Sequence, residues 1–249
     1  MRAIAVFNPK GGCGKTTSTL NIGFGLNSIG YRVMLVDLDP LGLLSLTLQL
    51  SNREAGTYQW IKKQASLTSV KREVRGVTVV PSNRLLAALD VEMAGIPGRE
   101  TLLRQALDQV RDYDYILFDC PPGFGLLNIN ALVAAGNVLV PVLAEHLDLM
   151  VLSQLQDTIA GIKRHFNPHL TLLGFFVNRF NRRKINKETQ AEINRLYPGL
   201  LFNSMVRDNV CVTESPTWGL DIFAYQANSS GAIDYLRLSR EISSGLPRR

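Results

Sequence analysis

The sequence predicts a doubly wound α/β fold, in which helices cover both faces of a mostly parallel β-sheet. Short apolar runs rich in β-branched and aromatic residues are typical of buried strands, and they alternate with stretches whose leucines have helical spacing. Strands that alternate with helices favour parallel pairing through crossover connections. The chain has 249 residues, 46% of them hydrophobic, which is enough to bury one sizeable core. We therefore expect a single domain over residues 1–249.

The expected elements follow one another in a regular order. The first strand covers residues 3–7, and the helix after it covers residues 16–30 and ends on Gly30. Further strands are expected at 32–39, 77–81, 115–122, 137–142 and 172–178, and further helices at 99–113 and 149–166. Residues 51–76 break this alternation, carry many basic side chains and are expected to form short helices on the surface. The sequence assigns no role to that segment.

Charge and cysteine content narrow the possible classes of protein. The formal net charge of +6 favours an anionic partner such as nucleic acid or a lipid surface. The three cysteines, Cys13, Cys120 and Cys211, lack the C-x-x-C spacing of metal and redox sites, which fits a reduced cytoplasm. No apolar stretch reaches the roughly 20 residues that a membrane-spanning helix needs. We expect a soluble, cytoplasmic protein.

The segment "GGCGKTT" lies between the first strand and the first helix, where backbone N–H groups and a helix N-terminus converge on phosphate oxygens. Lys15 would reach the β- and γ-phosphates of a nucleotide, and the Thr16 hydroxyl would bind Mg²⁺. The alternative is a glycine-rich turn that holds no ligand. The residues expected to contact the nucleotide here are Gly11, Gly12, Cys13, Gly14, Lys15, Thr16 and Thr17.

Three carboxylates are expected at the carboxyl edge of the sheet, beside the phosphates. Asp37 and Asp39 end the second strand, and Asp119 ends the strand "YILFD". Asp119 resembles a Walker B carboxylate that holds Mg²⁺ through water. Aspartates at strand ends can also be helix caps, and this alternative stays open for Asp37 and for Asp39.

The motif "KGGCGKTT" resembles the deviant Walker A box of the ParA/MinD partition and positioning ATPases. The blocks "VDLDP", "YDYILFDCPPGFGLLNINAL" and "GFFVNRFNRR" match that family in order, so the resemblance covers nearly the whole chain. The second half, with "ESPTWG" and "SSGAIDYLRLSREI", looks more like ParA than MinD. Because the first strand begins within a few residues of Met1, we expect no N-terminal DNA-binding extension, and the sequence most resembles Soj-like ParA proteins.

The resemblance implies roles for individual residues. Lys10 would reach across a dimer interface to the phosphates of a second subunit, so that ATP is enclosed between two copies of the chain. Asp39 would orient the attacking water. The resemblance thus implies three catalytic residues, Lys10, Lys15 and Asp39. Asp37 would lie in the second shell of Mg²⁺. The amide of Asn178 would meet the adenine edge, although it could instead cap a turn, and Arg207 is also assigned to the nucleotide site.

The sequence departs from the family pattern in two places. Leu41 and Leu43 replace a polar Gln and Asn after the second strand, and Asp208 and Cys211 stand where relatives have arginines tied to DNA contact. DNA binding could instead depend on a basic run and on arginines near the C-terminus, although such runs are often only solvated faces. These residues are Arg179, Arg182, Arg183, Lys184 and Lys187, followed by Arg237, Arg240, Arg248 and Arg249.

The leading functional hypothesis is an ATP- and Mg²⁺-dependent partition ATPase. It would dimerise on ATP, bind nucleoid DNA without sequence preference, and be released when a ParB-like or cargo-adaptor protein stimulates slow hydrolysis. The alternative is a nucleotide-switched factor that recruits a protein machine without binding DNA. A metabolic enzyme or an iron–sulfur carrier on the same scaffold is a third hypothesis, but Cys120 stands alone where a carrier needs paired cysteines. Membrane binding is not expected, because the C-terminus lacks an apolar stripe.

Overall fold

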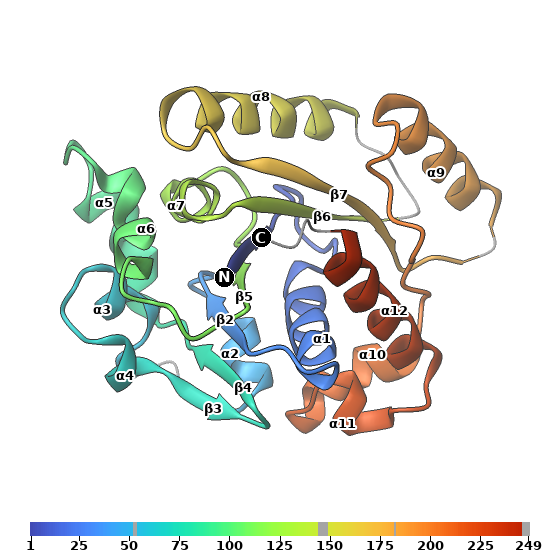
Figure 1. Cartoon of the computed structure of the whole chain (residues 1–249), viewed down its shortest axis with the longest axis horizontal. Helices are drawn as coiled ribbons and strands as arrows, with labels where there is room; N and C mark the ends of the chain where they lie inside the picture. The colour runs from blue at the N-terminus through green and yellow to red at the C-terminus, as the bar shows by residue number, and fades with distance from the viewer. Residues whose placement is uncertain (52–53, 144–148, 182, 246–249) are drawn as a thin grey trace.

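A seven-stranded β-sheet forms the centre of the computed structural model, which describes residues 1–51, 54–143, 149–181 and 183–245. The strand order is β3-β4-β2-β5-β1-β6-β7, and all neighbouring strands pair in parallel except β3 and β4 (Figure 1). This confirms the predicted fold class. The strands are β1 (Arg2–Val6), β2 (Val33–Asp37), β3 (Arg72–Val74), β4 (Val77–Val80), β5 (Tyr115–Asp119), β6 (Asn137–Leu143) and β7 (Thr171–Asn178).

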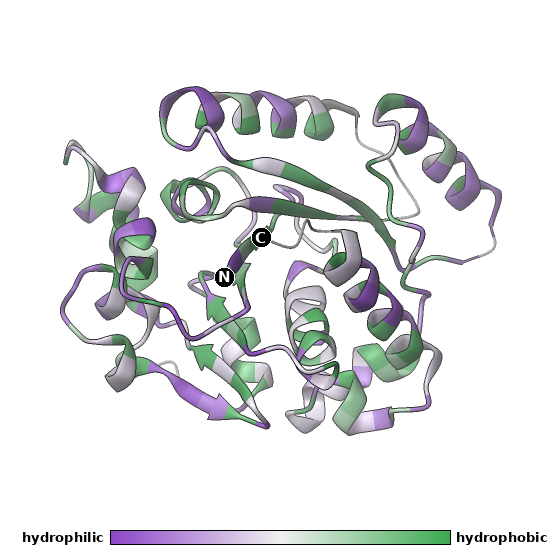
Figure 2. Cartoon of the chain, in the orientation of Figure 1, coloured by the Kyte–Doolittle hydropathy of each residue, from purple (hydrophilic) through white to green (hydrophobic). Residues whose placement is uncertain are grey.

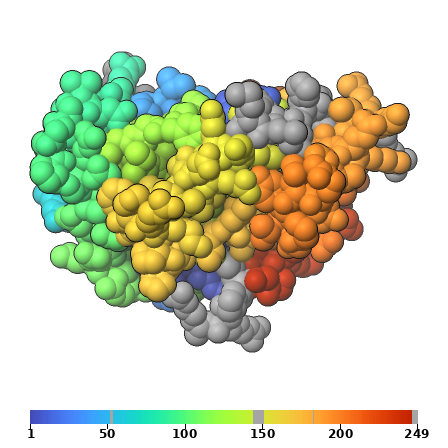
Figure 3. All heavy atoms as spheres, turned by 90° about the horizontal axis from the view of Figure 1, so that it is seen from above, coloured from blue at the N-terminus to red at the C-terminus, as the bar shows by residue number. Residues whose placement is uncertain are grey.

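Helices cover both faces of the sheet. One face packs against α3 (Thr57–Ile61), α6 (Leu102–Leu107), α7 (Leu126–Ala134), α8 (Leu149–His165) and α9 (Lys184–Leu196). The other packs against α1 (Lys15–Ser28), α2 (Leu43–Thr47), α11 (Ile222–Gln226) and α12 (Ser230–Gly245). Figure 3 shows α8 and α9 side by side on the outer surface. The remaining helical turns are α4 (Leu67–Val70), α5 (Leu89–Glu92), α10 (Val210–Glu214), η1 (Arg84–Ala88), η2 (Arg99–Thr101) and η3 (Ser215–Trp218). Among the described residues, none of these helices has the length and apolar character to cross a membrane.

Alternating side chains of each central strand enter the two cores. In β1, Ala3 and Ala5 pack into the core beneath α7 and α8, whereas Ile4 and Val6 pack into the core beneath α1 and α12. Both sides of the strand are apolar because helices cover both faces, as Figure 2 shows for the central strands. This two-sided burial explains why the strands read as continuous hydrophobic runs rather than as an alternation of polar and apolar residues.

The segment 51–76 differs from the expectation of surface helices alone. It does contain the short helices α3 and α4, but it also contributes the antiparallel edge strand β3. Tyr58, Trp60 and Ile61 of α3 are buried in the core against α6. The sequence did not reveal this burial, because α3 has only five residues and too few turns to show a periodic apolar stripe.

The helix expected over residues 99–113 is shorter than predicted. Its α-helical part, α6, ends at Leu107. The chain then turns so that the Asp114 backbone N–H donates to the Arg32 carbonyl at 2.8 Å, while the Arg32 N–H donates to the Asp114 carboxylate at 2.9 Å. These bonds align the starts of β5 and β2, and the helix ends before them because the connection needs extended chain.

An ion pair ties the β3–β4 turn to the C-terminal third of the chain. The Arg75 guanidinium donates to the Asp221 carboxylate at 3.0 and 3.1 Å and lies over the ring of Phe24, 5.0 Å from its centroid. Asp221 is buried, and its other oxygen accepts from the first N–H groups of α11. One carboxylate thus caps a helix and anchors a turn 146 residues away in sequence.

We expect Asp221→Ala to lower the free energy of unfolding by about 2 kcal/mol, because it removes a helix cap and leaves Arg75 without its partner. Urea denaturation followed by circular dichroism measures this difference. Glu188→Ala is the matched control, since it removes a carboxylate from an exposed ion pair with Lys184 and should change stability by less than about 0.5 kcal/mol. Equal effects of the two substitutions would contradict the anchoring role of Asp221.

Candidate functional site

The loop between β1 and α1 approaches β7 so closely that only glycine fits at position 14. Gly14 has φ of 86°, and a Cβ there would overlap the Asn178 side-chain amide. That amide donates from Nδ2 to the Cys13 carbonyl at 3.0 Å, so the end of β7 holds the loop in place. Gly11 and Gly12 lie exposed on the rim. The 14-residue helix α1 begins directly after the loop, at Lys15, and its N-terminal N–H groups can bind an anion.

The two lysines of the loop have different surroundings. Lys15 is only 6% exposed, and its ammonium donates to the Lys10 carbonyl at 2.9 Å. The Lys10 side chain is partly exposed and makes no hydrogen bond or ion pair with any residue that the structure describes. A phosphate binds an ammonium more strongly than a neutral carbonyl does, so an incoming phosphate would compete for Lys15. Lys10 is available for a partner outside its own loop.

The register of β2 and β5 places two buried carboxylates side by side. Asp37 and Asp119 are paired residues at the carboxyl ends of these strands, and both are fully buried. Burial raises the pKa of Asp37 to about 7, against three hydrogen bonds that lower it. These come from the Ser45 N–H at 3.0 Å, the Ser45 hydroxyl at 2.6 Å and the Asp39 N–H at 3.1 Å. Because both its oxygens already accept bonds, Asp37 fits a supporting role better than direct metal binding.

Asp119 has a free acceptor that suits a cation. Burial, and next the neighbouring Asp37, raise the pKa of Asp119 well above its usual range, while the Thr16 hydroxyl and the Lys15 ammonium lower it. Its Oδ2 atom is buried and has no hydrogen-bond partner among the described residues. The described part of the chain has no cluster of three or more His, Cys, Asp or Glu side chains placed to hold a metal. Mg²⁺ would therefore depend on Thr16, Asp119 and phosphate oxygens, which fits its preference for few protein ligands.

Asp39 lies on a tight turn between β2 and α2. It is 7% exposed, and its Oδ1 atom accepts from the Leu41 N–H at 2.9 Å. Its own carbonyl accepts from the Gly42 N–H at 2.8 Å and from the Ser82 hydroxyl at 2.5 Å. Sequence reasoning missed Ser82, which is 43 residues away and becomes a neighbour of Asp39 through the pairing of β2 with β4.

A cavity of about 330 Å³ opens beside the loop. Gly12, Gly14 and Thr17 form one side, and the other side is formed by Asn178, Arg179, residues 206–209, 212, 213 and 216, and Tyr235. Its volume and position beside the phosphate loop suit a nucleobase. The Asn178 amide borders this cavity, but its Nδ2 donates to the loop and its Oδ1 accepts from the Arg179 N–H at 3.0 Å.

Two ion pairs line the same cavity. The Arg207 guanidinium binds the buried carboxylate of Asp234 on α12 through two bonds of 2.7 and 2.8 Å. Arg179 lies 3.7 Å from the Asp208 carboxylate. Arg207 and Asp208 thus each have a partner of opposite charge. The sequence could not reveal these pairs, because Asp234 and Arg179 are distant in the chain.

The rest of the basic run is exposed on and before α9. Arg183, Lys184 and Lys187 are exposed, and Lys184 forms an ion pair with Glu188 at 3.5 Å. Arg237 and Arg240 are exposed on α12, about one helical turn apart. Arg182, Arg248 and Arg249 lie outside the described residues.

The other departures from the family pattern are also visible. Leu41 and Leu43 are 67% and 50% exposed, so the turn after β2 presents apolar side chains to solvent.

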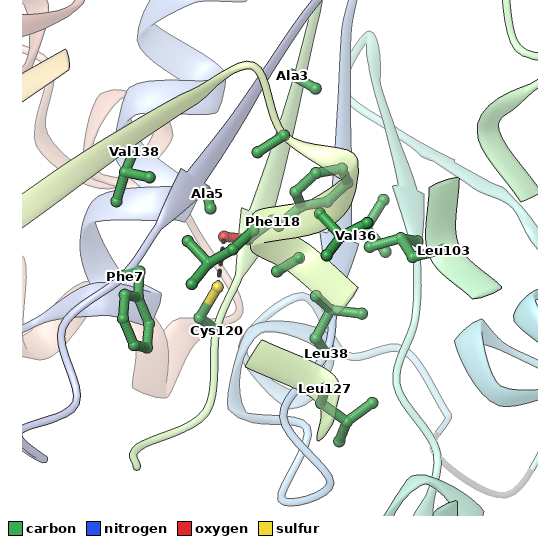
Figure 4. Packing of buried hydrophobic residues seen from close by; sticks show 14 of the residues in the cluster. Ala3, Ala5, Phe7, Val36, Leu38, Leu103, Phe118, Cys120, Leu127 and Val138 are labelled. Atoms are coloured by element: carbon green, nitrogen blue, oxygen red, sulfur yellow. Dashed lines mark hydrogen bonds between the residues drawn. The ribbon is translucent and has the colours of Figure 1, made fainter. Parts of the chain in front are cut away.

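Cys120 is buried among apolar side chains that include Phe7 and Leu127, as Figure 4 shows, and burial raises the pKa of its thiol well above the usual value. A neutral, enclosed thiol of this kind is a poor cluster ligand.

Known proteins match this chain over nearly its whole length. The AAA domain family profile matches residues 1–172. The chromosome partitioning protein ParA of Caulobacter vibrioides is 32% identical over 252 residues, which cover 98% of this chain and 94% of that protein. The sporulation initiation inhibitor protein Soj of Bacillus subtilis is 34% identical over 98% of both chains. The crystal structure of cobyrinic acid a,c-diamide synthase from Mycobacterium smegmatis, with bound ADP and magnesium, has a TM-score of 0.84 at 29% identity, covering 96% of this chain and 92% of that one.

We expect Gly14→Ala to destabilise the protein by about 1 kcal/mol or more, because the added methyl group meets Asn178 and the left-handed backbone disfavours alanine. Urea denaturation measures the change. Gly11→Ala is the matched control in the same loop: nothing lies within 4 Å of its added Cβ and its φ is not in the left-handed range. Equal stability of Gly14→Ala and the parent protein would contradict the close packing of the loop on β7.

Proposed function

The chain belongs to the ParA/MinD family of partition and positioning ATPases, and we propose that it binds ATP with Mg²⁺, dimerises in that state and hydrolyses the nucleotide slowly. The observation that carries this proposal is the arrangement around Asp119. A buried carboxylate with a free oxygen lies beside Thr16 and Lys15, at the N-terminus of α1. Such a site would place a metal cation and the Lys15 ammonium beside the phosphates, where both would neutralise negative charge.

Lys15 would bind the β- and γ-phosphates, and Thr16 with Asp119 would hold Mg²⁺, which neutralises phosphate charge when bound. Asp39 would orient the attacking water, since its second carboxylate oxygen has no hydrogen bond among the described residues. The nucleobase of ATP would lie in the cavity beside Asn178 and Arg207, next to Gly12 and Gly14. All of residues 1–249 would act as one ATPase domain.

The free side chain of Lys10 supports the dimer. Its backbone carbonyl accepts a hydrogen bond from the Lys15 ammonium, while its own ammonium has no partner among the described residues. A second ammonium adds little to phosphates that Lys15 and Mg²⁺ already neutralise, but it can stabilise the γ-phosphate held by another copy. ATP would thus be needed at both sites for the dimer to form, and hydrolysis would release it.

We propose that the dimer binds DNA without sequence preference, as a cytoplasmic protein associated with the nucleoid. The exposed cations Arg183, Lys184 and Lys187 and the net charge of +6 support this. A ParB-like or cargo-adaptor protein would stimulate hydrolysis. The neutralisation of Arg179 by Asp208 favours the second candidate, a factor that recruits a protein machine without DNA. Partition is preferred because ParA and Soj are 32% and 34% identical to this chain, and each match covers 98% of it.

We expect Asp39→Ala to bind ATP and accumulate as a dimer, because the substitution removes water orientation and keeps the phosphate-binding loop. Light scattering after size exclusion, in ATP and Mg²⁺, measures the dimer, and phosphate release measures hydrolysis. Lys15→Ala is the control, since it should lose ATP binding and remain a monomer. A monomeric Asp39→Ala protein at saturating ATP would contradict the proposed division of roles.

We expect reversing the charges of Arg183 and Lys187 to glutamate to weaken the binding of every duplex alike and to flatten its salt dependence, because phosphate contacts carry no sequence information. The measurement is retention of short duplexes by the ATP-bound Asp39→Ala dimer over a salt series. Light scattering should show that the dimer itself survives.

The control reverses Lys163 and Arg164 at the end of α8, which changes the net charge equally at another exposed position. Equal weakening by both pairs would show that net charge, not the α9 face, governs binding. Failure of the parent dimer to retain any duplex would favour the recruitment function.

A further inference from the structure

Ser82 reaches the turn that carries Asp39 with both its side chain and its backbone. It lies two residues after the end of β4, beyond Pro81, and is fully buried. Its hydroxyl donates to the Asp39 carbonyl at 2.5 Å, and its N–H donates to the Ser45 hydroxyl at 2.9 Å. The Ser45 hydroxyl in turn donates to Asp37 at 2.6 Å. Ser82 thus links the turn after β2 to the first turn of α2 and to the buried carboxylate.

The position of the Asp39 carboxylate depends on this backbone, because the side chain has only two rotatable bonds beyond it. The Asp39 N–H donates to Asp37, and its carbonyl accepts from Gly42 and Ser82. Of these three bonds, only the one from Ser82 joins the turn to the segment that follows β4. The other two lie within the turn of residues 37–42. Without the bond from Ser82, the Asp39 carbonyl would be held only by a bond within its own turn.

Ser82 is itself held by the segment whose role the sequence left open. The Thr57 N–H and hydroxyl donate to the Pro81 carbonyl at 2.8 and 3.1 Å. The Asn83 amide donates to Gln59 at 2.6 Å. The residues on both sides of Ser82 are therefore fixed by α3, whose own apolar side chains are buried in the core. This gives α3 a structural connection to the turn after β2.

We propose that Ser82 is a positioning residue for ATP hydrolysis, which sets the carboxylate of Asp39 at the distance that orients the attacking water. The proposal rests on the proposed function, since it takes Asp39 as the water-orienting group. A shift of about 1 Å in such a group can cost up to a hundredfold in rate, while nucleotide binding depends on other residues. Loss of the Ser82 hydroxyl should therefore lower kcat and leave KM nearly unchanged.

The test is single-turnover hydrolysis of radiolabelled ATP, with the protein in excess, for Ser82→Ala, Asp39→Ala and the double variant. We expect Ser82→Ala to slow hydrolysis about tenfold, with nucleotide affinity changed less than about twofold. In the Asp39→Ala background, the same substitution should have no further effect, because no carboxylate remains to be positioned. Ser239→Ala, which removes an equally buried hydroxyl on α12, is the control that should keep the parent rate.

The outcomes separate this inference from the proposed function. If Asp39→Ala hydrolyses ATP at the parent rate, the catalytic assignment of Asp39 fails. If Asp39→Ala is slow but Ser82→Ala is as fast as the parent, only the role of Ser82 is overturned. The role is also overturned if Ser82→Ala slows the Asp39→Ala protein by the same factor as the parent. Should Ser82→Ala not fold, Ser82→Cys keeps the side-chain shape with a weaker donor and should be slowed in the same direction.

Discussion

Two carboxylates lie next to each other inside the protein, and most features of the site follow from the need to stabilise them. The pairing of β2 with β5 puts Asp37 opposite Asp119, and neither is exposed to water. Removing a charge from water costs several kcal/mol unless partners replace the lost solvation. Asp37 obtains three donated hydrogen bonds, from Ser45 and from the backbone of Asp39. Asp119 keeps an oxygen without a hydrogen-bond partner among the described residues, and a proton or a bound cation would stabilise it.

The phosphate loop can lie close to these carboxylates because glycine and asparagine make its contact with β7 very short. The Asn178 amide occupies the space that a side chain at position 14 would need, and it holds the Cys13 carbonyl. This fixes the start of α1, and with it Lys15. The Asn178 side chain thus connects the loop to β7, whether or not it also contacts a nucleobase.

The sequence could predict the features that depend on local pattern. Continuous apolar runs revealed β1, β2 and β5 because these strands are buried on both faces, and "GGCGKTT" revealed the loop because its backbone geometry needs glycine. It could not predict β3, which has only three residues, or the burial of Trp60 in a helix of five. Ser82 was also missed. Its contact with Asp39 depends on strand order, and no property of a single serine in a loop distinguishes it from a solvated one.

The charges that depart from the family pattern show how local pairing alters a basic surface. Arg207 is bound by Asp234, and Asp208 lies beside Arg179, so this side of the cavity is nearly neutral. The remaining exposed cations of the run lie on α9 or directly before it, and Glu188 already pairs with Lys184. In one copy of the chain this run therefore offers few uncompensated cations to a polyanion, and each weak contact is screened by salt. Two copies held together would double that number on one assembly, and the summed contacts would make binding steeply dependent on the dimer. An ATP-dependent dimer would in this way act as the switch for binding DNA, without any base-specific contact.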